Sequence, residues 1–244
     1  GRPGRRAVAA LMPELKRQYR PDVIVANGEN AAGGFGLTMG AAEELLSCGI
    51  ELITMGNHTW DNKEIFTVLT EHSEVIRPAN YPPGAPGNGF GIIRVGGGGT
   101  SGAKIAVINL NGRVFMDQAD DPFRAFDEIY DEIRASVSAV FVDFHAEATS
   151  EKVAFGWFAD GRATGVFGTH THVPTADERI LPMGTAYITD VGMTGPLNSV
   201  LGIDTSIIIR RFRSQLPERF EIAKGPVSLN SLIVDFDELT GKAL

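Results

Sequence analysis

The chain alternates between short apolar runs, which predict buried strands, and longer segments with helical spacing of apolar residues. Four runs have the continuous apolar character of strands covered on both faces: "DVIVAN", "IELITMG", "AVFVDFHAE" and "ATGVFGTH". Two others, "GFGIIRV" and "AKIAVINLNG", predict a hairpin whose turn lies in the run from Gly96 to Gly99. The segments "GTAYITDVG" and "SLNSLIVDFD" predict two further strands near the end of the chain.

Helical patterns lie between these strands. Residues 4–19 have helical apolar spacing despite Pro13, residues 38–49 begin at the N-cap candidate Thr38, and residues 62–72 continue the series. The most regular helix is predicted over residues 120–136, where apolar residues recur with a period near 3.6. The alternation, with no repeat or linker, predicts an α/β fold in which helices cover both faces of a sheet.

Composition narrows the classes of protein that fit this pattern. The 244 residues are 43% hydrophobic and 21% charged, which is ordinary for a globular protein. No run approaches the roughly 18 apolar residues of a membrane span and no apolar leader opens the sequence, so we expect a cytoplasmic protein. The single cysteine, Cys48, cannot form an internal disulfide and is expected to be a small buried hydrophobe.

The formal net charge of −8 bears on the substrate. Binding long nucleic acid without sequence preference requires a basic surface that neutralises phosphates, so the acidic balance argues against that function. An anionic substrate would need positive charge concentrated in one place. Bound cations are the obvious source of such local charge.

Polar side chains gather where the predicted strands end. The segments "NGEN", "GNH", "DFHAE" and "GTHTH" each close one strand, and four of the five histidines fall within them: His58, His145, His170 and His172. Because the carboxyl ends of parallel strands meet along one edge of a sheet, we expect these side chains to lie close together. His170 and His172 are one residue apart, and alternate side chains of an extended chain face the same space.

These residue types suit a transition-metal centre. Imidazole nitrogens together with carboxylate and amide oxygens favour manganese, iron, zinc or cobalt, whereas magnesium or calcium would be bound almost entirely by oxygen. The candidate ligands are Glu29, Asn57, His145, His170 and His172. This supply exceeds the needs of one cation and favours two, which can generate a hydroxide nucleophile and hold the oxygens of a phosphoryl group. Glu29 is the natural bridge between them, and His58 is placed to donate a proton to the leaving oxygen.

Other nearby residues have both functional and structural interpretations. Asp143 could orient an imidazole or be a solvated strand end, and Trp60 could stack a nucleobase or cover the start of a helix. The sequence contains no phosphate-binding G-x-x-x-x-G-K-[ST] loop, no G-x-S-x-G elbow and no H-E-x-x-H helix. The glycines of "AAGGFGLTMG" do not match G-x-G-x-x-G and instead favour a sharply turning loop.

In order along the chain, the motifs "GEN", "GNHTWDN", "FHAEATSEK", "GTHTHVPTAD" and "DVGMTGP" resemble the YmdB-type branch of the calcineurin-like metallophosphoesterases. Glu29 of "GEN" stands where most members of the superfamily have a bridging Asp, and "GTHTH" replaces the usual GHxH; both are features of this branch. The resemblance implies a four-layer α/β fold, with a central β-sandwich flanked by helices. It also implies a dinuclear metal centre and phosphodiesterase activity on 2′,3′-cyclic or 3′,5′-cyclic nucleotides.

The resemblance also implies a role for each residue that matches a motif. Glu29 would bridge both metals, Asn30 and His172 would complete one site, Asn57, His145 and His170 would form the other, and His58 would donate the proton. The implied cofactors are two divalent or trivalent ions, with iron or manganese ahead of zinc. The implied partner is a small cyclic nucleotide, with no membrane and no long nucleic acid, and a homo-oligomeric state is left open.

The family normally begins with an apolar strand ending in Gly-Asp just before the "GRPGRR" that opens this sequence, and that Asp ligates the first metal. The resemblance therefore predicts that residues 1–244 are a single metallophosphoesterase domain whose first metal site is incomplete. We favour an N-terminally incomplete chain over the alternative, a protein that has lost the strand and one metal site. The alternative functions are a metal-dependent phosphomonoesterase or nuclease with the same centre, and a metal-binding regulatory protein without turnover.

Overall fold

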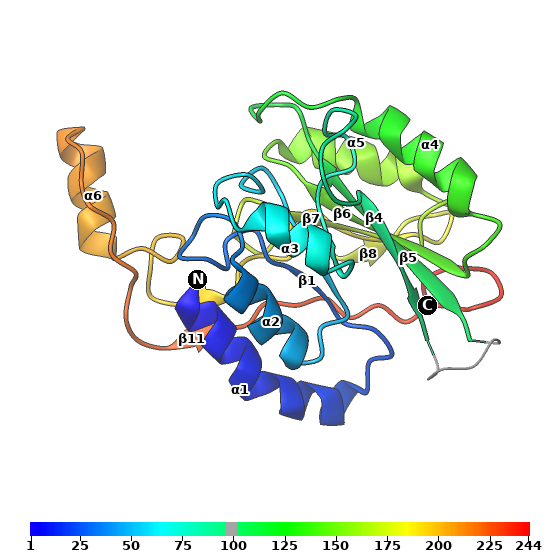
Figure 1. Ribbon diagram of the computed structural model, residues 1–244, viewed down its shortest axis with the longest axis horizontal. Helices are drawn as coiled ribbons and strands as arrows, with labels where there is room; N and C mark the ends of the chain where they lie inside the picture. The colour runs from blue at the N-terminus through cyan, green and yellow to red at the C-terminus, as the bar shows by residue number, and fades with distance from the viewer. Residues whose placement is uncertain (96–101) are drawn as a thin grey trace.

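Two facing β-sheets form the centre of the protein in a computed structural model that describes residues 1–95 and 102–244 (Figure 1). The smaller sheet has three parallel strands in the order β1-β2-β3, which are Val25–Asn27, Leu52–Thr54 and Val75–Ile76. The larger sheet has the order β4-β5-β6-β7-β9-β8, which are Phe90–Arg94, Lys104–Asn111, Ala139–His145, Gly165–Thr169, Ala186–Ile188 and Arg179–Ile180. A separate antiparallel pair consists of β10, Gly195–Pro196, and β11, Val227–Ser228.

The larger sheet is parallel at its centre and antiparallel at its edges. Strands β5, β6, β7 and β9 run in one direction, whereas β4 pairs antiparallel with β5 and β8 pairs antiparallel with β9. The register places Asn111, His145 and Thr169 next to one another at the carboxyl ends of β5, β6 and β7. The parallel register therefore aligns at one edge the residues that the sequence places at strand ends.

Helices cover the outer face of each sheet. Three helices, α1 (Arg2–Tyr19), α2 (Met39–Ser47) and α3 (Ile65–Glu71), share a core with the smaller sheet that includes Met12, Leu45, Ile53 and Val68. Two helices, α4 (Pro122–Ile133) and α5 (Thr149–Ala159), share another core with the larger sheet that includes Phe126, Phe144 and Phe155. A third cluster, containing Leu52, Ile76 and Val107, lies between the two sheets. The resulting four layers confirm the predicted fold class.

Local sequence signals set several of these boundaries. The Thr38 hydroxyl accepts a hydrogen bond from the Ala41 backbone N–H at the start of α2. The Asp121 carboxylate does the same for the first two N–H groups after Pro122, at the start of α4. The N-cap predicted at Thr38 is therefore confirmed.

Some predicted elements differ from the structure. The strand predicted in "SLNSLIVDFD" is wrong, because residues 229–235 have no strand pairing and Ile233 is half-exposed. An apolar run forms a strand only where a sheet edge is free to pair with it, and the sequence pattern does not reveal such an edge. The predicted antiparallel pairing of β4 and β5 is confirmed, whereas the predicted turn from Gly96 to Gly99 lies outside the described residues. The single domain predicted over residues 1–244 stays a prediction.

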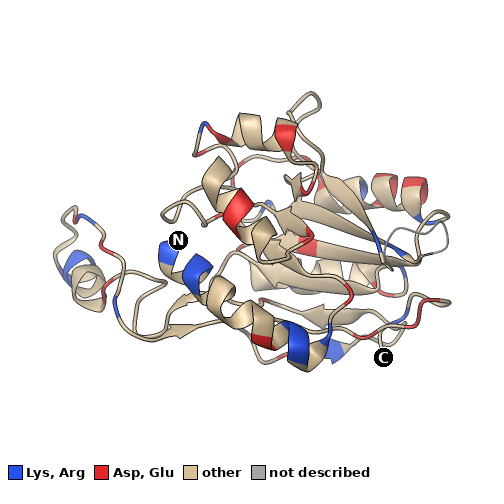
Figure 2. Cartoon of the chain, turned by 60° about the horizontal axis from the view of Figure 1, so that its bottom comes forward, with Lys and Arg blue, Asp and Glu red and all other residues tan. Residues whose placement is uncertain are grey.

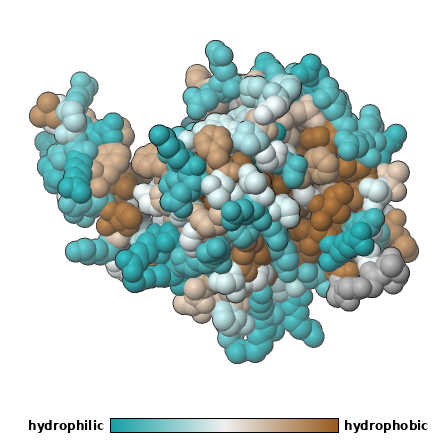
Figure 3. Space-filling model, in the orientation of Figure 1, coloured by the Kyte–Doolittle hydropathy of each residue, from teal (hydrophilic) through white to brown (hydrophobic). Residues whose placement is uncertain are grey.

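Two helices of the structure were not predicted from the sequence pattern. In α5 the buried side chains include Lys152, so a charged residue interrupts the apolar face that would have indicated the helix. The sixth helix, α6 (Thr205–Ser214), projects away from the two sheets (Figure 1). The projecting segment exposes apolar side chains among hydrophilic ones (Figure 3), including Phe212 and Leu216. None of the described helices combines the length and apolar character needed to cross a membrane.

The core between the larger sheet and its helices should dominate stability. Leu110 is 0% exposed and Leu239 is 96% exposed. We expect Leu110→Ala to lower the free energy of unfolding by about 2 to 5 kcal/mol, because it removes buried methyl groups and leaves a cavity. Leu239→Ala, the matched control, should change it by less than about 0.5 kcal/mol. Urea unfolding of both variants measures the difference, and equal losses would contradict the assigned core.

Candidate metal centre

The polar clusters of the sequence meet at the carboxyl edge of the two sheets, as predicted. Glu29 follows β1, Asn57 follows β2, His145 ends β6, and His170 and His172 follow β7. Glu29 and His145 are each 1% exposed, so the centre of the cluster is shielded from solvent. Ligand atoms of Glu29, His145 and His170 all lie within 4.8 Å of one another.

Three groups converge on one ring nitrogen, His145 Nε2. The Glu29 Oε2 atom lies 2.9 Å from it, the Asn57 Oδ1 atom lies 2.9 Å from it, and His170 Nδ1 lies 3.1 Å from it. One nitrogen can carry one hydrogen at most, so it cannot satisfy all three groups by hydrogen bonding.

The other ring nitrogen of His145 determines which of the two carries the proton. His145 Nδ1 lies 2.8 Å from Thr169 Oγ1, and the Thr169 hydroxyl donates to Asp143 Oδ1 at 2.6 Å. A hydroxyl has a single hydrogen, so its oxygen must accept from an N–H at Nδ1 of His145. In the neutral ring Nε2 is then a bare acceptor that faces two oxygen acceptors. The lone pairs of these three atoms repel one another unless a cation lies between them, so the donor set fits a metal ion.

Glu29 carries a buried negative charge that the described residues do not fully satisfy. Burial by itself would raise its pKa, but the adjacent imidazoles, with His145 contributing most, lower the pKa instead. Its Oε1 atom is buried and has no hydrogen-bond partner among residues 1–95 and 102–244. An ionised carboxylate with one unpartnered oxygen is what a cation-binding bridge would require.

The two histidines after β7 are prepared as neutral ligands. Burial lowers the pKa of His170 to about 4, with a further contribution from the neighbouring His145. Burial also lowers the pKa of His172, again with a contribution from His145. An imidazole must be deprotonated to bind a metal, so both rings have the required form at neutral pH.

His172 meets the remaining candidate ligand, Asn30. Their Nε2 and Oδ1 atoms are 3.1 Å apart, and Asn30 also donates through Nδ2 to the Gly34 carbonyl at 2.8 Å. The structure thus places the predicted ligands in two adjoining groups, one around His145 and one formed by Asn30 and His172.

The backbone that carries the two histidines is not extended. His170 has φ 105° and His172 has φ 67°, so both occupy positive-φ conformations that side chains rarely adopt. The expectation that they share a face because the chain is extended is therefore wrong. They are brought near the centre by a strained turn, and such strain persists only where the surroundings enforce it.

A buried ion pair holds that turn. Lys152 Nζ lies 2.6 Å from Asp190 Oδ2 and donates to the Thr169 carbonyl at 2.7 Å. The same Asp190 oxygen accepts from the Thr171 backbone N–H at 3.0 Å, between the two histidines. The two side chains are only 1% and 2% exposed, so their charges are compensated mainly by each other and by the turn.

His58 lies beside the ligand cluster. Its backbone N–H points to Glu29 Oε2 at 3.5 Å, and its Nδ1 lies 2.8 Å from Asp61 Oδ2. Because the carboxylate accepts a hydrogen bond from Nδ1, the Nε2 atom is the nitrogen left to exchange a proton with a substrate.

Several residues that shape the site were missed or undecided in the sequence. A Cβ atom on Gly56 would lie 2.0 Å from Glu29 Oε2 and 2.4 Å from His145 Nε2, so only glycine fits there. The signal was present as the first letter of "GNH". Asp143 is 0% exposed, which rules out the solvated interpretation. Trp60 stacks on Phe66 with ring centroids 5.6 Å apart, so it is a packing residue.

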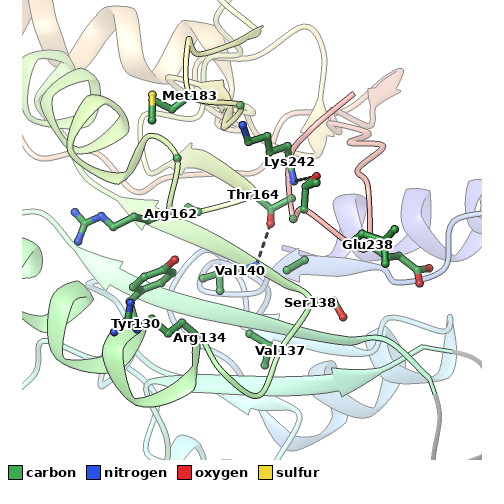
Figure 4. A pocket seen from close by; sticks show the side chains of 17 residues that line it. Tyr130, Arg134, Val137, Ser138, Val140, Arg162, Thr164, Met183, Glu238 and Lys242 are labelled. Carbon is green, nitrogen blue, oxygen red and sulfur yellow. Dashed lines mark hydrogen bonds between the residues drawn. The ribbon is translucent and has the colours of Figure 1, made fainter.

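Among the described residues, no second cluster of possible metal ligands lies at the opposite edge of the sheets. A cavity of about 340 Å³ lies near the amino ends of β6 and β7 and is lined by Tyr130, Arg162 and Lys242, among others (Figure 4). Arg162 already pairs with Asp127 at 2.6 Å. Elsewhere Lys and Arg side chains are interspersed with acidic ones, with local groups on α1 and α6 (Figure 2). The ligand cluster is therefore the chemically distinctive place among the described residues.

A four-layer fold with carboxylate, amide and imidazole groups at the sheet edge defines the protein as a metallophosphoesterase. The chain belongs to the YmdB-like protein family, whose model matches residues 1–244. It is 51% identical over 244 residues to the 2′,3′-cyclic-nucleotide 2′-phosphodiesterase of Bacillus subtilis (strain 168), covering 100% of this chain and 90% of that protein.

Solved structures agree with this assignment. A novel phosphatase from Mycoplasma pneumoniae matches with a TM-score of 0.91 and 38% identity, covering 100% of this chain and 87% of that one. A hypothetical protein from Thermus thermophilus matches with a TM-score of 0.85 and 45% identity, covering 92% of this chain and 85% of that one. The family and the ligand cluster together point to a divalent metal centre.

The hydroxyl of Thr169 should control the proton position on His145. We expect Thr169→Val to leave Asp143 Oδ1 without its donor and His145 Nδ1 without its acceptor, which lowers the free energy of unfolding by about 1 to 3 kcal/mol. Nitrogen NMR of the metal-free protein should find His145 protonated at Nδ1 in the wild type and a tautomer mixture in the variant. Thr70→Val, which removes an exposed hydroxyl, is the control. An unchanged tautomer in Thr169→Val would contradict the relay from Asp143.

Proposed function

We propose that the protein is a dinuclear metal-dependent phosphodiesterase that hydrolyses cyclic nucleotides, with 2′,3′-cyclic nucleotides as the first candidates. The observation that carries this proposal is the convergence of Glu29, Asn57 and His170 on the Nε2 atom of His145. The substrate class is supported by the Bacillus subtilis relative, which is 51% identical and is named a 2′,3′-cyclic-nucleotide 2′-phosphodiesterase.

The ligand assignment follows the two adjoining groups. Glu29, Asn57, His145 and His170 would hold one ion, and Glu29, Asn30 and His172 would hold the other. Mixed nitrogen and oxygen donors favour iron or manganese ahead of zinc. When bound, the two ions would supply Lewis-acid charge to the phosphoryl oxygens and make an attacking water more acidic. The chain's own contribution is the fixed tautomer of His145 and the ionised, buried Glu29.

His58 completes the reaction as the proton donor. Hydrolysis of a cyclic phosphodiester adds water across one P–O bond, so the ring opens to a phosphomonoester and the departing ribose oxygen takes up a proton. The Asp61 carboxylate, 2.8 Å from Nδ1, fixes the orientation of the His58 ring. The geometry allows Nε2 to hold the proton that the leaving oxygen receives.

The metal-site assignment predicts metal content. Replacing His145 or His170 with alanine removes an imidazole ligand, so each variant should retain less manganese or iron than the wild type and lose hydrolysis in proportion. His72→Ala, on the helix end after α3, is the matched control and should keep its metal. Elemental analysis after desalting measures the content. Full metal in both ligand variants would exclude them as ligands.

The role of His58 predicts a dependence on the leaving group. His58→Ala should keep its metals yet lose roughly 10²- to 10⁴-fold in kcat on a cyclic nucleotide, whose alkoxide leaving group needs a proton. The loss should be much smaller on bis-p-nitrophenyl phosphate, because nitrophenolate departs without protonation. Equal losses on both substrates would assign His58 a different role.

The alternative functions make separate predictions about the wild type. A phosphomonoesterase with the same centre would prefer p-nitrophenyl phosphate to the diester at equal manganese, and a metal-binding regulatory protein would turn over neither. Comparing kcat/KM on the two esters therefore separates the proposed phosphodiesterase from a phosphomonoesterase and from a regulatory protein.

A further inference from the structure

Phe35 is a large apolar side chain exposed to solvent beside His58. Its side chain is 57% exposed, and its ring meets the imidazole of His58 edge-on, with centroids 5.3 Å apart and an interplanar angle of 85°. Exposed phenylalanines occur elsewhere on this chain. The distinctive feature of Phe35 is its contact with the residue assigned as the proton donor.

The loop that carries Phe35 is tied to the ligand cluster. It begins directly after Glu29 and Asn30, and the Asn30 amide donates to the Gly34 carbonyl at 2.8 Å. Gly33, Gly34 and Gly36 all have positive φ, and the Ala32 N–H donates to the Gly36 carbonyl at 3.0 Å. The loop therefore turns sharply at Phe35, and the Asn30 contact ties its backbone to the ligand cluster.

The chemistry of the substrate indicates what would lie against that ring. When a 2′,3′-cyclic nucleotide opens, one of the two ribose oxygens leaves phosphorus and takes the proton that His58 supplies. The 2′ oxygen is borne by C2′, and the base is attached to the adjacent carbon, C1′. A ribose whose leaving oxygen faces His58 therefore brings its base to the immediate neighbourhood of the His58 ring, where Phe35 lies.

Phe35, and not Trp60, presents an exposed aromatic ring beside His58. Trp60, the stacking candidate in the sequence, packs against Phe66 and Tyr81 within the protein. A flat aromatic face can accept any of the four bases, since each base has a π face, and stacking alone selects weakly between them.

We propose that Phe35 forms a base-stacking subsite that binds the purine or pyrimidine ring of the nucleotide substrate beside His58. The subsite rests on the proposed phosphodiesterase function and adds the part of the substrate that the metal centre does not contact. It also explains why a solvent-exposed phenylalanine is held in a loop of glycines next to His58.

The test compares two cyclic phosphodiesters that differ in the base. Steady-state KM and kcat are measured with manganese on 2′,3′-cyclic AMP and on glycerol 1,2-cyclic phosphate, which has the same five-membered phosphate ring and no base. Phe35→Ala should raise KM for 2′,3′-cyclic AMP by about 5- to 100-fold and leave KM for the base-free ester unchanged. Phe35→Tyr and Phe35→Trp should keep the wild-type KM for both, because each retains an aromatic face.

The matched control is Phe212→Ala, which removes an exposed phenylalanine from the projecting helix α6. It should leave both substrates unaffected. An equal rise in KM on both esters in Phe35→Ala would show that Phe35 only supports His58, and an unchanged KM on 2′,3′-cyclic AMP would show that it does not contact the base; either result overturns the subsite. If the wild type hydrolyses both esters, either of these results would overturn the subsite and leave the phosphodiesterase function intact. If the wild type hydrolyses neither ester, the function and the subsite are overturned together.

Discussion

The buried carboxylate of Asp143 is the interaction on which the rest of the site depends. It accepts hydrogen bonds from the Asn27 amide at 3.0 Å, the Thr54 hydroxyl at 2.5 Å and the Thr169 hydroxyl at 2.6 Å. These donors end strands of both sheets, so one carboxylate joins the two halves of the sandwich at the edge where the ligands gather. Burial raises the pKa of Asp143, and the three donors oppose that rise. The same contacts set the proton position on His145.

Stability and function are in tension at the turn after β7. Positive φ at His170 and His172 costs conformational free energy, and burying Lys152 and Asp190 costs desolvation. The ion pair offsets the strain of the turn because it binds the turn backbone at Thr169 and Thr171. The same hydrogen bonds from the turn offset the desolvation of the two buried charges. A turn enforced by its surroundings can hold two imidazoles in place before any metal arrives, which is the preorganisation that a ligand set needs.

The acidic character of the chain is compatible with an anionic substrate because charge is organised locally. The net charge is −8, yet the imidazoles that follow β7 are neutral and the ionised group at the centre of the cluster, Glu29, is a metal-bridge candidate. Positive charge at this edge would then come from bound cations, and the exposed ring of Phe35 would contribute affinity that does not depend on charge.

The sequence by itself determined the class of fold, the strand ends that carry the chemistry, and the residues Glu29, Asn57, His145, His170 and His172 as one set, because apolar periodicity and residue type are local properties. Only the tertiary structure decided how these residues face one another. The protonation of His145 depends on Thr169 and Asp143, and the turn that carries His170 depends on Lys152 and Asp190. The strand predicted in "SLNSLIVDFD" does not form for a related reason, since strand pairing requires a free sheet edge. Each of these features is a contact between segments distant along the chain, and no local pattern encodes such contacts.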